Sequence, residues 1–286
     1  MEEKAYAKIN LGLNVLGKRC DGYHDVDMIM QTISLADEVE LTKAESFLLT
    51  TDDAELVCDE SNLAWKAANL MGKLVNRKPN VHIHIKKRIF VAAGLAGGSS
   101  DGAAVLRGLN KLWKTGFSAR KLETIAAQLG SDVPFCISGG TTRATGRGEI
   151  LKALPDMPLM WLVLAKPKNI AVSTSWVYKN LGENVEKIPL IDNLEKAIKI
   201  QDGNSVLQNL GNVLESVTIP AYPSIGEIKD TMLKAGALAA LMSGSGPTVF
   251  GIAADKNTAE EIASILQVNR EMQIAVARTI QRSENL

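Results

Sequence analysis

A run of small residues between a strand pattern and a helix pattern is the feature that most constrains the fold of this chain. Residues Val81–Lys87 alternate between apolar and polar side chains, which predicts a strand, and Ser99–Trp113 has apolar residues at helical spacing. The run Gly94-Leu-Ala-Gly-Gly-Ser-Ser100 lies between them. Glycines let the backbone approach a ligand closely, and the amides at a helix start favour an anion. The junction therefore predicts a phosphate-binding loop, with a tight structural turn capped by serine as the alternative.

Strand and helix patterns alternate along the chain and predict an α+β fold. Besides the segments above, strands are predicted at 4–16, 38–42, 47–51, 161–165, 237–242, 248–253 and 272–280. Helices are predicted after a Ser61 cap, from Ser118 to Gly130, and over 173–181, 193–200, 205–217, 224–235 and 257–267. A short polar break near 150–160 divides the chain into predicted domains of residues 1–155 and 156–286.

The first alternating segment also contains a near match to a known phosphate motif. Its apolar residues are expected to share the one buried face of a strand: Ile9, Leu11, Leu13 and Val15. Gly12–Lys18 nearly matches the phosphate loop GxxxxGK[ST], but Arg19 replaces the hydroxyl that should hold Mg²⁺. Since the match lies inside a strand pattern, we do not interpret it as a phosphate loop.

Composition excludes several classes of function. Lys+Arg and Asp+Glu both number 32, for a net charge of +0, which argues against a nucleic-acid groove or an anionic membrane partner. The cysteines Cys20, Cys58 and Cys136 form no metal or disulfide pattern. No signal-peptide pattern is present, and no apolar run approaches the roughly 20 residues of a membrane helix. We therefore expect a cytoplasmic enzyme that acts on a small molecule.

Histidine chemistry receives little support. His82 and His84 stand at i and i+2 and could ligate a metal, but no third ligand is near in sequence, so solvated strand residues are favoured. Serine hydrolysis needs a histidine base, yet the chain has 3 His and no GxSxG motif.

Two further loops are each weak signals alone. Met242-Ser-Gly-Ser-Gly-Pro-Thr248 lies between apolar strands, as many hairpin loops do. Gly130-Ser-Asp132-Val-Pro134 places a carboxylate between a helix end and a proline turn, where aspartate often caps local backbone.

Taken together, these loops resemble the GHMP kinase superfamily. Its first motif is similar to Ala5-Tyr-Ala-Lys-Ile-Asn-Leu-Gly-Leu13, its ATP loop to Gly94–Ser100, its catalytic segment to Gly130–Phe135 and its third motif to Ser243–Pro247. The resemblance covers nearly the whole chain. Gly-Tyr-His at 22–24 is specific to a subfamily whose substrate carries a cytidine diphosphate.

The resemblance implies a fold and an activity. The N-terminal domain would be like the second domain of ribosomal protein S5 and the C-terminal domain ferredoxin-like, with the active site between them. The enzyme would move the γ-phosphoryl group of ATP to the 2-hydroxyl of 4-(cytidine 5′-diphospho)-2-C-methyl-D-erythritol, giving the 2-phosphate and ADP, in the non-mevalonate route to isopentenyl diphosphate. Alternatives are another GHMP kinase, of the homoserine or mevalonate type, and a non-catalytic nucleotide-binding module.

The resemblance also implies site residues. Asp132 matches the proposed base, and Lys8 would offset charge on the attacking oxygen and the γ-phosphoryl group. ATP and Mg²⁺ are the implied cofactors, with no assigned metal ligand beyond Ser99 as a candidate. The ATP-binding residues would be Phe90, Val91, Ala92, Ala93, Gly94, Leu95, Ala96, Gly97, Gly98, Ser99 and Ser100. Phe90 stands where the family often has proline, and Ala92, Ala93 and Ala96 where it often has glycine.

The implied substrate residues come from two segments. Tyr23 would stack on the cytosine and His24 would contact its hydrogen-bonding edge. Tyr178 would supply the other side of a sandwich, with Trp176 as a competitor for that place. Asn10 would contact the erythritol end, and Thr174 completes the implied set.

Overall fold

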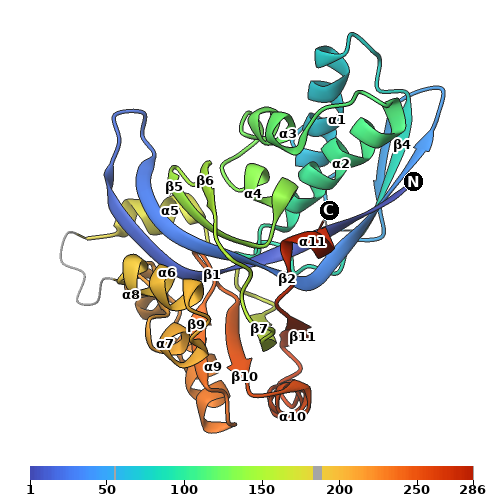
Figure 1. Cartoon of the computed structure of the whole chain (residues 1–286). Coiled ribbons are helices and arrows are strands. Elements are labelled where there is room, and N and C mark those ends of the chain that lie inside the picture. Colours follow the sequence, from blue (N-terminus) through green and yellow to red (C-terminus); the bar gives the residue numbers. More distant parts are fainter. Residues whose placement is uncertain (55, 183–188, 286) are drawn as a thin grey trace.

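Two long antiparallel strands organise the first half of the chain (Figure 1). The computed structural model describes residues 1–54, 56–182 and 189–285. β1 (Glu2–Lys18) and β2 (His24–Lys43) form the centre of a seven-stranded sheet. One half of β2 pairs with β5 (Thr141–Gly146) and the other with β4 (Val81–Lys86). The sheet is completed by β3 (Leu48–Thr51), β6 (Ile150–Ala153) and the short β8 (Gly211–Asn212).

The prediction of one buried face for residues 4–16 is wrong, because β1 is buried on both faces and changes face along its length. Ile9 and Leu11 join one apolar cluster, whereas Leu13 belongs to the other. The pairing of β1 with β2 shifts register between Asn10 and Gly12. Because a one-residue slip sends the following side chains to the opposite face, Leu13 lies on the same side as Lys8.

Four helices cover the side of the sheet away from the C-terminal part (Figure 1). They are α1 (Leu63–Leu74), α2 (Gly97–Trp113), α3 (Ala119–Ala126) and α4 (Val133–Ser138). α2 is the most deeply placed, with an unbroken buried run from Ser100 to Leu109. Its apolar residues pack with those of α1, β1 and α4, so the helix start is held firmly beneath the small-residue loop.

A four-stranded antiparallel sheet forms the core of the C-terminal part. Its order is β11 (Met272–Arg278), β7 (Trp161–Pro167), β10 (Val249–Ala253) and β9 (Ala239–Met242). α9 (Pro223–Lys234) and α10 (Lys256–Gln267) pack on this sheet. The other helices are α5 (Thr174–Asn180), α6 (Ile191–Lys199), α7 (Gly203–Gln208), α8 (Glu215–Ala221) and α11 (Arg282–Asn285). The α+β class is thus confirmed.

The two sheets are joined by a shared apolar layer. Leu162 and Leu164 of β7 belong to the same buried cluster as Ile9 and Ile29 of the first sheet. Each sheet is therefore covered by helices on one face and by the other sheet on its second face. Because the two sheets pack together, loops from distant parts of the chain meet at one cleft. No helix in the described ranges combines the length and the apolar character that crossing a bilayer requires.

Several predicted elements differ from the structure. β2 begins at His24, far before the predicted 38, because residues 28–33 are buried on both faces and so show no alternation of apolar and polar side chains. The predicted helix over 205–217 is divided among α7, β8 and α8. Asn62 caps α1 in place of Ser61, whose hydroxyl donates to Asp59. β5, β6 and α4 were not predicted, since each is only 4 to 6 residues long.

A charged cluster ties α6 to the first sheet. Glu195 of α6 is buried and accepts hydrogen bonds from Lys152 and Lys199 at 2.6 and 2.7 Å and from Arg143 at 2.8 Å. Burial opposes ionisation, but these hydrogen bonds outweigh it and lower the pKa of Glu195 to about 2. The same helix packs against β1, where any Cβ at Gly12 would lie 2.7 Å from Ile191 Cδ1. Close helix packing therefore accounts for that glycine.

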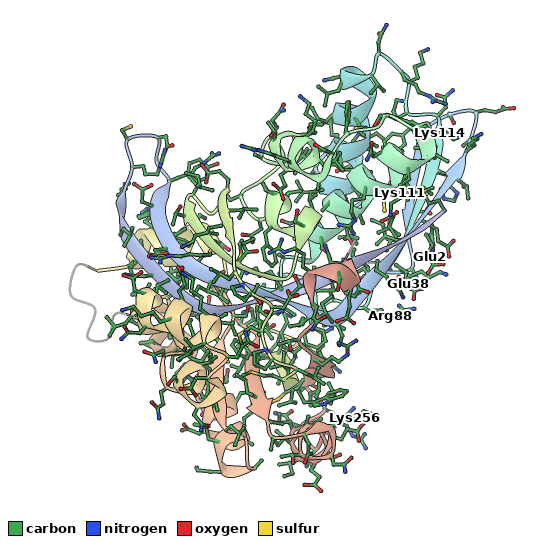
Figure 2. All side chains as sticks on the ribbon, viewed as in Figure 1. Glu2, Glu38, Arg88, Lys111, Lys114 and Lys256 are labelled. Atoms are coloured by element: carbon green, nitrogen blue, oxygen red, sulfur yellow. The ribbon has the colours of Figure 1, made fainter. Side chains whose placement is uncertain are left out.

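We expect Glu195→Gln to lower the free energy of unfolding by about 2 kcal/mol at pH 7, because it removes charge-assisted hydrogen bonds from a buried site. A lowered pKa stabilises the fold above the ordinary value of 4.5 and loses that contribution as pH falls toward about 2. The variant should therefore lose less stability than the wild type over this range, as measured by urea unfolding. Glu38→Gln, on the outer strand face shown in Figure 2, is the control and should cost less than 1 kcal/mol. Equal losses at pH 7 would contradict the role assigned to Glu195.

Candidate active site

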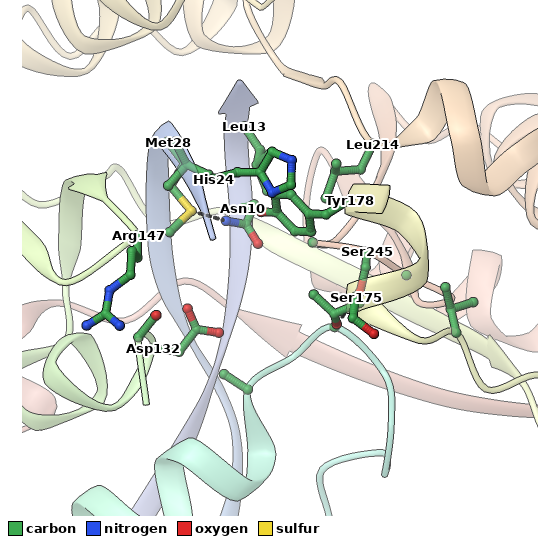
Figure 3. A pocket seen from close by; sticks show the side chains of 18 of the residues that line it. Asn10, Leu13, His24, Met28, Asp132, Arg147, Ser175, Tyr178, Leu214 and Ser245 are labelled. Atoms are coloured by element: carbon green, nitrogen blue, oxygen red, sulfur yellow. Dashed lines mark hydrogen bonds between the residues drawn. The ribbon is translucent and has the colours of Figure 1, made fainter. Parts of the chain in front are cut away.

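A cavity of about 1510 Å³ lies where the β1–β2 hairpin, the small-residue loop and the C-terminal part meet. Its lining comes from β1, residues 90–99, Asp132, α5 and the loop 244–246. Figure 3 shows Asn10, Asp132, Tyr178 and Ser245 directed toward this space from separate elements. The three loops singled out in the sequence are therefore brought together.

Lys8 is the centre of the hydrogen bonding in the cavity. Its side chain is buried and donates to Asn10 Oδ1 at 2.7 Å and to the Gly94 carbonyl at 3.0 Å. Its Nζ lies 4.0 Å from Asp132 Oδ2. The Asn10 amide in turn donates to Met28 Sδ at 3.3 Å (Figure 3). A buried ammonium thus joins β1, the loop and the carboxylate that the sequence had placed in three separate motifs.

Asp132 stands at the N-cap of the short helix α4, with Pro134 in its first turn. Its side chain makes no capping hydrogen bond there and retains 33% of its exposure. The alternative interpretation, an aspartate that caps local backbone with its side chain, is not what the structure shows. The carboxylate instead faces the cavity opposite Lys8.

The loop before α2 is in backbone contact with the loop Met242–Thr248 between β9 and β10, which we call the third loop. A Cβ on Gly94 would lie 2.1 Å from the Ser243 carbonyl, and the φ of Gly94 is +74°. The Ser243 hydroxyl donates to the Gly94 carbonyl at 2.9 Å. Asn212 holds the third loop from behind by donating to the carbonyls of Met242 and Gly244. Glycine is required at position 94 because the two backbones are in contact.

Most but not all of the implied ATP-binding residues line the cavity. Ala92 and Ala96 adopt φ of 50° and 58°, values that favour glycine. α2 begins at Gly97, so Ser99 lies within its first turn instead of starting it. Leu95 is buried in the apolar layer, and the Ser100 hydroxyl donates to the Tyr6 carbonyl at 2.6 Å. Those two side chains are therefore not in the cavity lining.

The aromatic residues take two different places. His24 lies against Tyr178, with ring centroids 5.2 Å apart, and both line the cavity. Burial and the nearby Asp132 charge raise the pKa of Tyr178. Trp176 packs edge-on against Tyr222 and is not in the lining, so Tyr178 is better placed than its competitor. Tyr23, 54% exposed, lies beneath the Arg147 guanidinium at 4.9 Å.

Thr174 also lies at the edge of the C-terminal loops. Its hydroxyl is 2.9 Å from the Ser245 hydroxyl, and both residues line the cavity. This contact links α5 to the third loop.

Besides Lys8, the cavity has cations that the sequence interpretation did not include. Its described lining holds Lys18, Arg147 and Lys179, and Lys87, which is paired with buried Asp37 and Asp101, against a single lining carboxylate, Asp132. Such a balance favours anionic ligands. Arg147 could have been noticed in the sequence, because it stands between Gly146 and Gly148 in a turn of the kind that carries function.

The histidines of β4 take no part in the cavity. The Thr50 hydroxyl lies 2.8 Å from both His82 Nε2 and His84 Nδ1, so the pair is half-buried and bridged instead of freely solvated. Within the ranges that the structure describes, no group of three or more His, Cys, Asp or Glu could hold a metal.

We expect Gly94→Ala to lower the free energy of unfolding by about 3 kcal/mol, because its Cβ would overlap the Ser243 carbonyl in a left-handed backbone. Gly98→Ala is the control, since a Cβ there finds nothing nearer than Leu63 Cδ1 at 3.9 Å. Denaturant unfolding of both variants measures the difference. A Gly94→Ala protein as stable as Gly98→Ala would show that the two loops are not in fixed contact.

Comparisons with known proteins agree along the whole chain. The family of GHMP kinases N terminal domains matches residues 62–140, and that of GHMP kinases C terminal domains matches residues 190–269. A 4-diphosphocytidyl-2-C-methyl-D-erythritol kinase of Enterococcus faecalis is 50% identical over 262 residues, covering 91% of this chain and 92% of the relative. One of Geobacillus thermodenitrificans is 52% identical over 252 residues, covering 87% of each.

Solved structures give the same result. A crystal structure of 4-(cytidine 5′-diphospho)-2C-methyl-D-erythritol kinase superposes with a TM-score of 0.83 at 31% identity, covering 98% of this chain and 99% of the other. A homoserine kinase from Cytophaga hutchinsonii, at 18% identity and a TM-score of 0.75 over 98% of this chain and 95% of the other, shares the fold. The expected two-domain fold is confirmed. The chain therefore belongs to the GHMP kinases, and among them to the family of 4-diphosphocytidyl-2-C-methyl-D-erythritol kinases.

Proposed function

We propose that this chain transfers the γ-phosphoryl group of ATP to the 2-hydroxyl of 4-(cytidine 5′-diphospho)-2-C-methyl-D-erythritol, giving the 2-phosphate and ADP on the non-mevalonate route to isopentenyl diphosphate. The observation that carries the proposal is the Lys8–Asp132 pair, which lies in one cavity with both the small-residue loop and the His24–Tyr178 rings. Relatives at about 50% identity bear the name of this activity.

Asp132 is proposed as the base. The 2-hydroxyl is tertiary and very weakly acidic, so a carboxylate within hydrogen-bond reach would accept its proton as the oxygen attacks phosphorus. Lys8, 4.0 Å away, would offset the negative charge on the attacking oxygen and the phosphoryl group. Phosphoryl transfer asks little covalent chemistry of the protein, so positioning and charge should supply most of the rate.

The cytidine is proposed to bind between the hairpin and α5. Tyr178 would stack on the base and His24 would contact its hydrogen-bonding edge, with Tyr23 on the other side of the sandwich. Asn10 would contact the erythritol end of the substrate. Thr174 would contact the substrate from the C-terminal part of the protein. A substrate without a base, such as homoserine or mevalonate, would leave these rings unused, which favours the cytidylyl substrate over the other GHMP kinase types.

ATP is proposed to bind along residues 90–100, with its phosphates at the start of α2. The Ser99 hydroxyl lies in the described lining of the cavity, in the first turn of α2, and it fits Mg²⁺ because that ion takes oxygen ligands and is held largely by substrate phosphates. When bound, Mg²⁺ neutralises phosphate charge. Ser99 remains the candidate protein ligand.

The two predicted domains are proposed to have different roles. Residues 1–155 would form the ATP-binding and catalytic domain, and residues 156–286 would close the cleft through α5 and the third loop. The substrate is a small molecule, and the protein is proposed to work in the cytoplasm. A net charge of +0 gives no reason to expect a nucleic-acid partner.

We expect Asp132→Asn to lower kcat by about 10²-fold or more, since the proton would have no acceptor, while the KM for ATP changes little. Lys8→Met should also lower kcat by about 10²-fold by removing charge stabilisation. ADP release with the cytidylyl substrate measures both, and thermal unfolding verifies the fold of each variant. Wild-type kcat in Asp132→Asn would refute the base. Equal turnover of homoserine or mevalonate by the wild type would refute the substrate, and no ATP-dependent phosphorylation at all would leave a nucleotide-binding module.

Arg147 is proposed to bind the diphosphate of the cytidylyl substrate, because its guanidinium lines the cavity above Tyr23. Arg147→Ala should raise the KM for that substrate about tenfold and leave the KM for ATP unchanged. Lys256→Ala is the matched control: Lys256 begins α10, its Nζ lies 5.9 Å from the centroid of the Trp161 ring of β7, and it is not in the cavity lining. CDP should inhibit the wild type more strongly than cytidine does, and Arg147→Ala should lose this difference. If the advantage of CDP over cytidine is the same in both enzymes, the arginine does not bind the diphosphate.

A further inference from the structure

Three buried charged groups lie beneath the small-residue loop. Lys87 Nζ is 2.5 Å from Asp37 Oδ2 and 2.8 Å from Asp101 Oδ2. The three side chains retain 7%, 0% and 3% of their exposure. One ammonium is therefore shared by two carboxylates that come from β2 and α2, and we refer to this set as the Asp37–Lys87–Asp101 triad.

Asp37 also holds the start of the loop by its backbone. Its Oδ1 accepts the amide hydrogens of Arg88 at 2.5 Å and Ile89 at 2.8 Å. These are the residues immediately before Phe90. The Asp37 carboxylate therefore fixes the backbone at the entry to the loop through two charge-assisted hydrogen bonds.

Asp101 stands beyond the other end of the same loop, just past the first turn of α2. Its Oδ2 binds Lys87, while its buried Oδ1 has no hydrogen-bond partner among the described residues. Gly97, the first residue of α2, lies beside the same ammonium, since a Cβ there would be in ordinary contact with Lys87 Nζ at 3.6 Å. The same ammonium thus fixes both the first residues of the loop and the helix start that follows it.

Stability alone is a weak reason for such a set. Removing three charges from water is costly, and apolar residues of similar volume often stabilise a core as well as a buried ion pair does. The two carboxylates exceed the one ammonium in charge, and Asp101 Oδ1 is unsatisfied. What apolar residues could not do is hold two backbone segments at a fixed distance through directional bonds.

We propose that the Asp37–Lys87–Asp101 triad positions the nucleotide loop, by fixing residues 88–97 at both ends so that their amides are already arranged for the phosphates of ATP. The inference rests on the proposed function for the ATP site, but not on the identity of the phosphoryl acceptor. The triad residues are positioning residues that act through the loop. Losing one of these contacts should make the loop more mobile. Nucleotide binding should then weaken, because ATP must order the loop each time it binds and part of the binding free energy is lost in doing so.

Asp101→Asn is the sharpest test, since it is isosteric and leaves a neutral Lys87–Asp37 pair. We expect its Kd for ATP, measured by calorimetry, to rise roughly fivefold, with the KM for the phosphoryl acceptor unchanged and thermal stability kept. Amide hydrogen exchange of peptides covering residues 88–100 should become faster. Lys111→Met is the matched control. Lys111 also lies on α2 and is labelled in Figure 2, and it pairs with the buried Glu3 of β1 at 2.9 Å. At roughly 1.5 Å per residue it is about 15 Å beyond Asp101 along the helix axis. This variant should leave both ATP affinity and loop exchange unchanged.

The second variant is Asp37→Asn, which is isosteric, keeps an Oδ1 that can accept the Arg88 and Ile89 amides and leaves Lys87 paired with Asp101. It should give the same weakening and the same faster exchange, even if Asp101→Asn does not fold. Unchanged ATP affinity together with unchanged loop exchange in a folded triad variant would overturn the positioning role, as would an equal effect of Lys111→Met. Failure of the cytidylyl substrate to react would refute the proposed reaction alone, because the affinity and exchange measurements do not use it.

Discussion

The cleft depends on the buried ammonium of Lys8. Its hydrogen bonds to Asn10 and to the Gly94 carbonyl, with Asp132 at 4.0 Å, connect segments that are far apart in the chain. A lysine 4% exposed needs such partners, because an unpaired buried charge is very costly. The conformation of the small-residue loop, the position of Asp132 and the side of β1 that carries Lys8 must therefore all place their groups around the Lys8 ammonium.

The strand that carries Lys8 explains how the cleft and the core coexist. Over residues 7–13, β1 lies between the helix layer and the C-terminal sheet, and both of its faces are buried there. The register shift after Asn10 sends Leu13 to the cavity side while Ile9 and Leu11 stay in the apolar layer. One strand thus supplies polar groups for chemistry, an apolar wall for the ligand and core packing.

Backbone contact between loops is the second constraint. Gly94 touches Ser243, and Asn212 anchors the far side of that contact. The Asp37–Lys87–Asp101 triad holds the same loop from below. The cavity is therefore rigid where phosphates are proposed to bind and lined by exposed, less constrained groups, such as Tyr23, where the base is proposed to bind. The rigid amides suit the phosphates of ATP, which many enzymes bind. The less constrained rings suit the base of the cytidylyl substrate, which few enzymes bind.

The sequence by itself determined the strand–loop–helix junction at 94–100 and the α+β class, because these follow from local spacing and glycine content. It assigned the motifs that contain Lys8 and Asp132 through their resemblance to the GHMP kinases. It could not give the extent of β2 or the face of Leu13, since a strand pattern disappears where both faces are buried and where a bulge shifts register. The place of Arg147, the burial of Leu95 and Ser100 and the Lys87 triad were decided by tertiary structure alone. Contacts between residues 14 to 124 positions apart depend on how layers stack, and no local pattern records that.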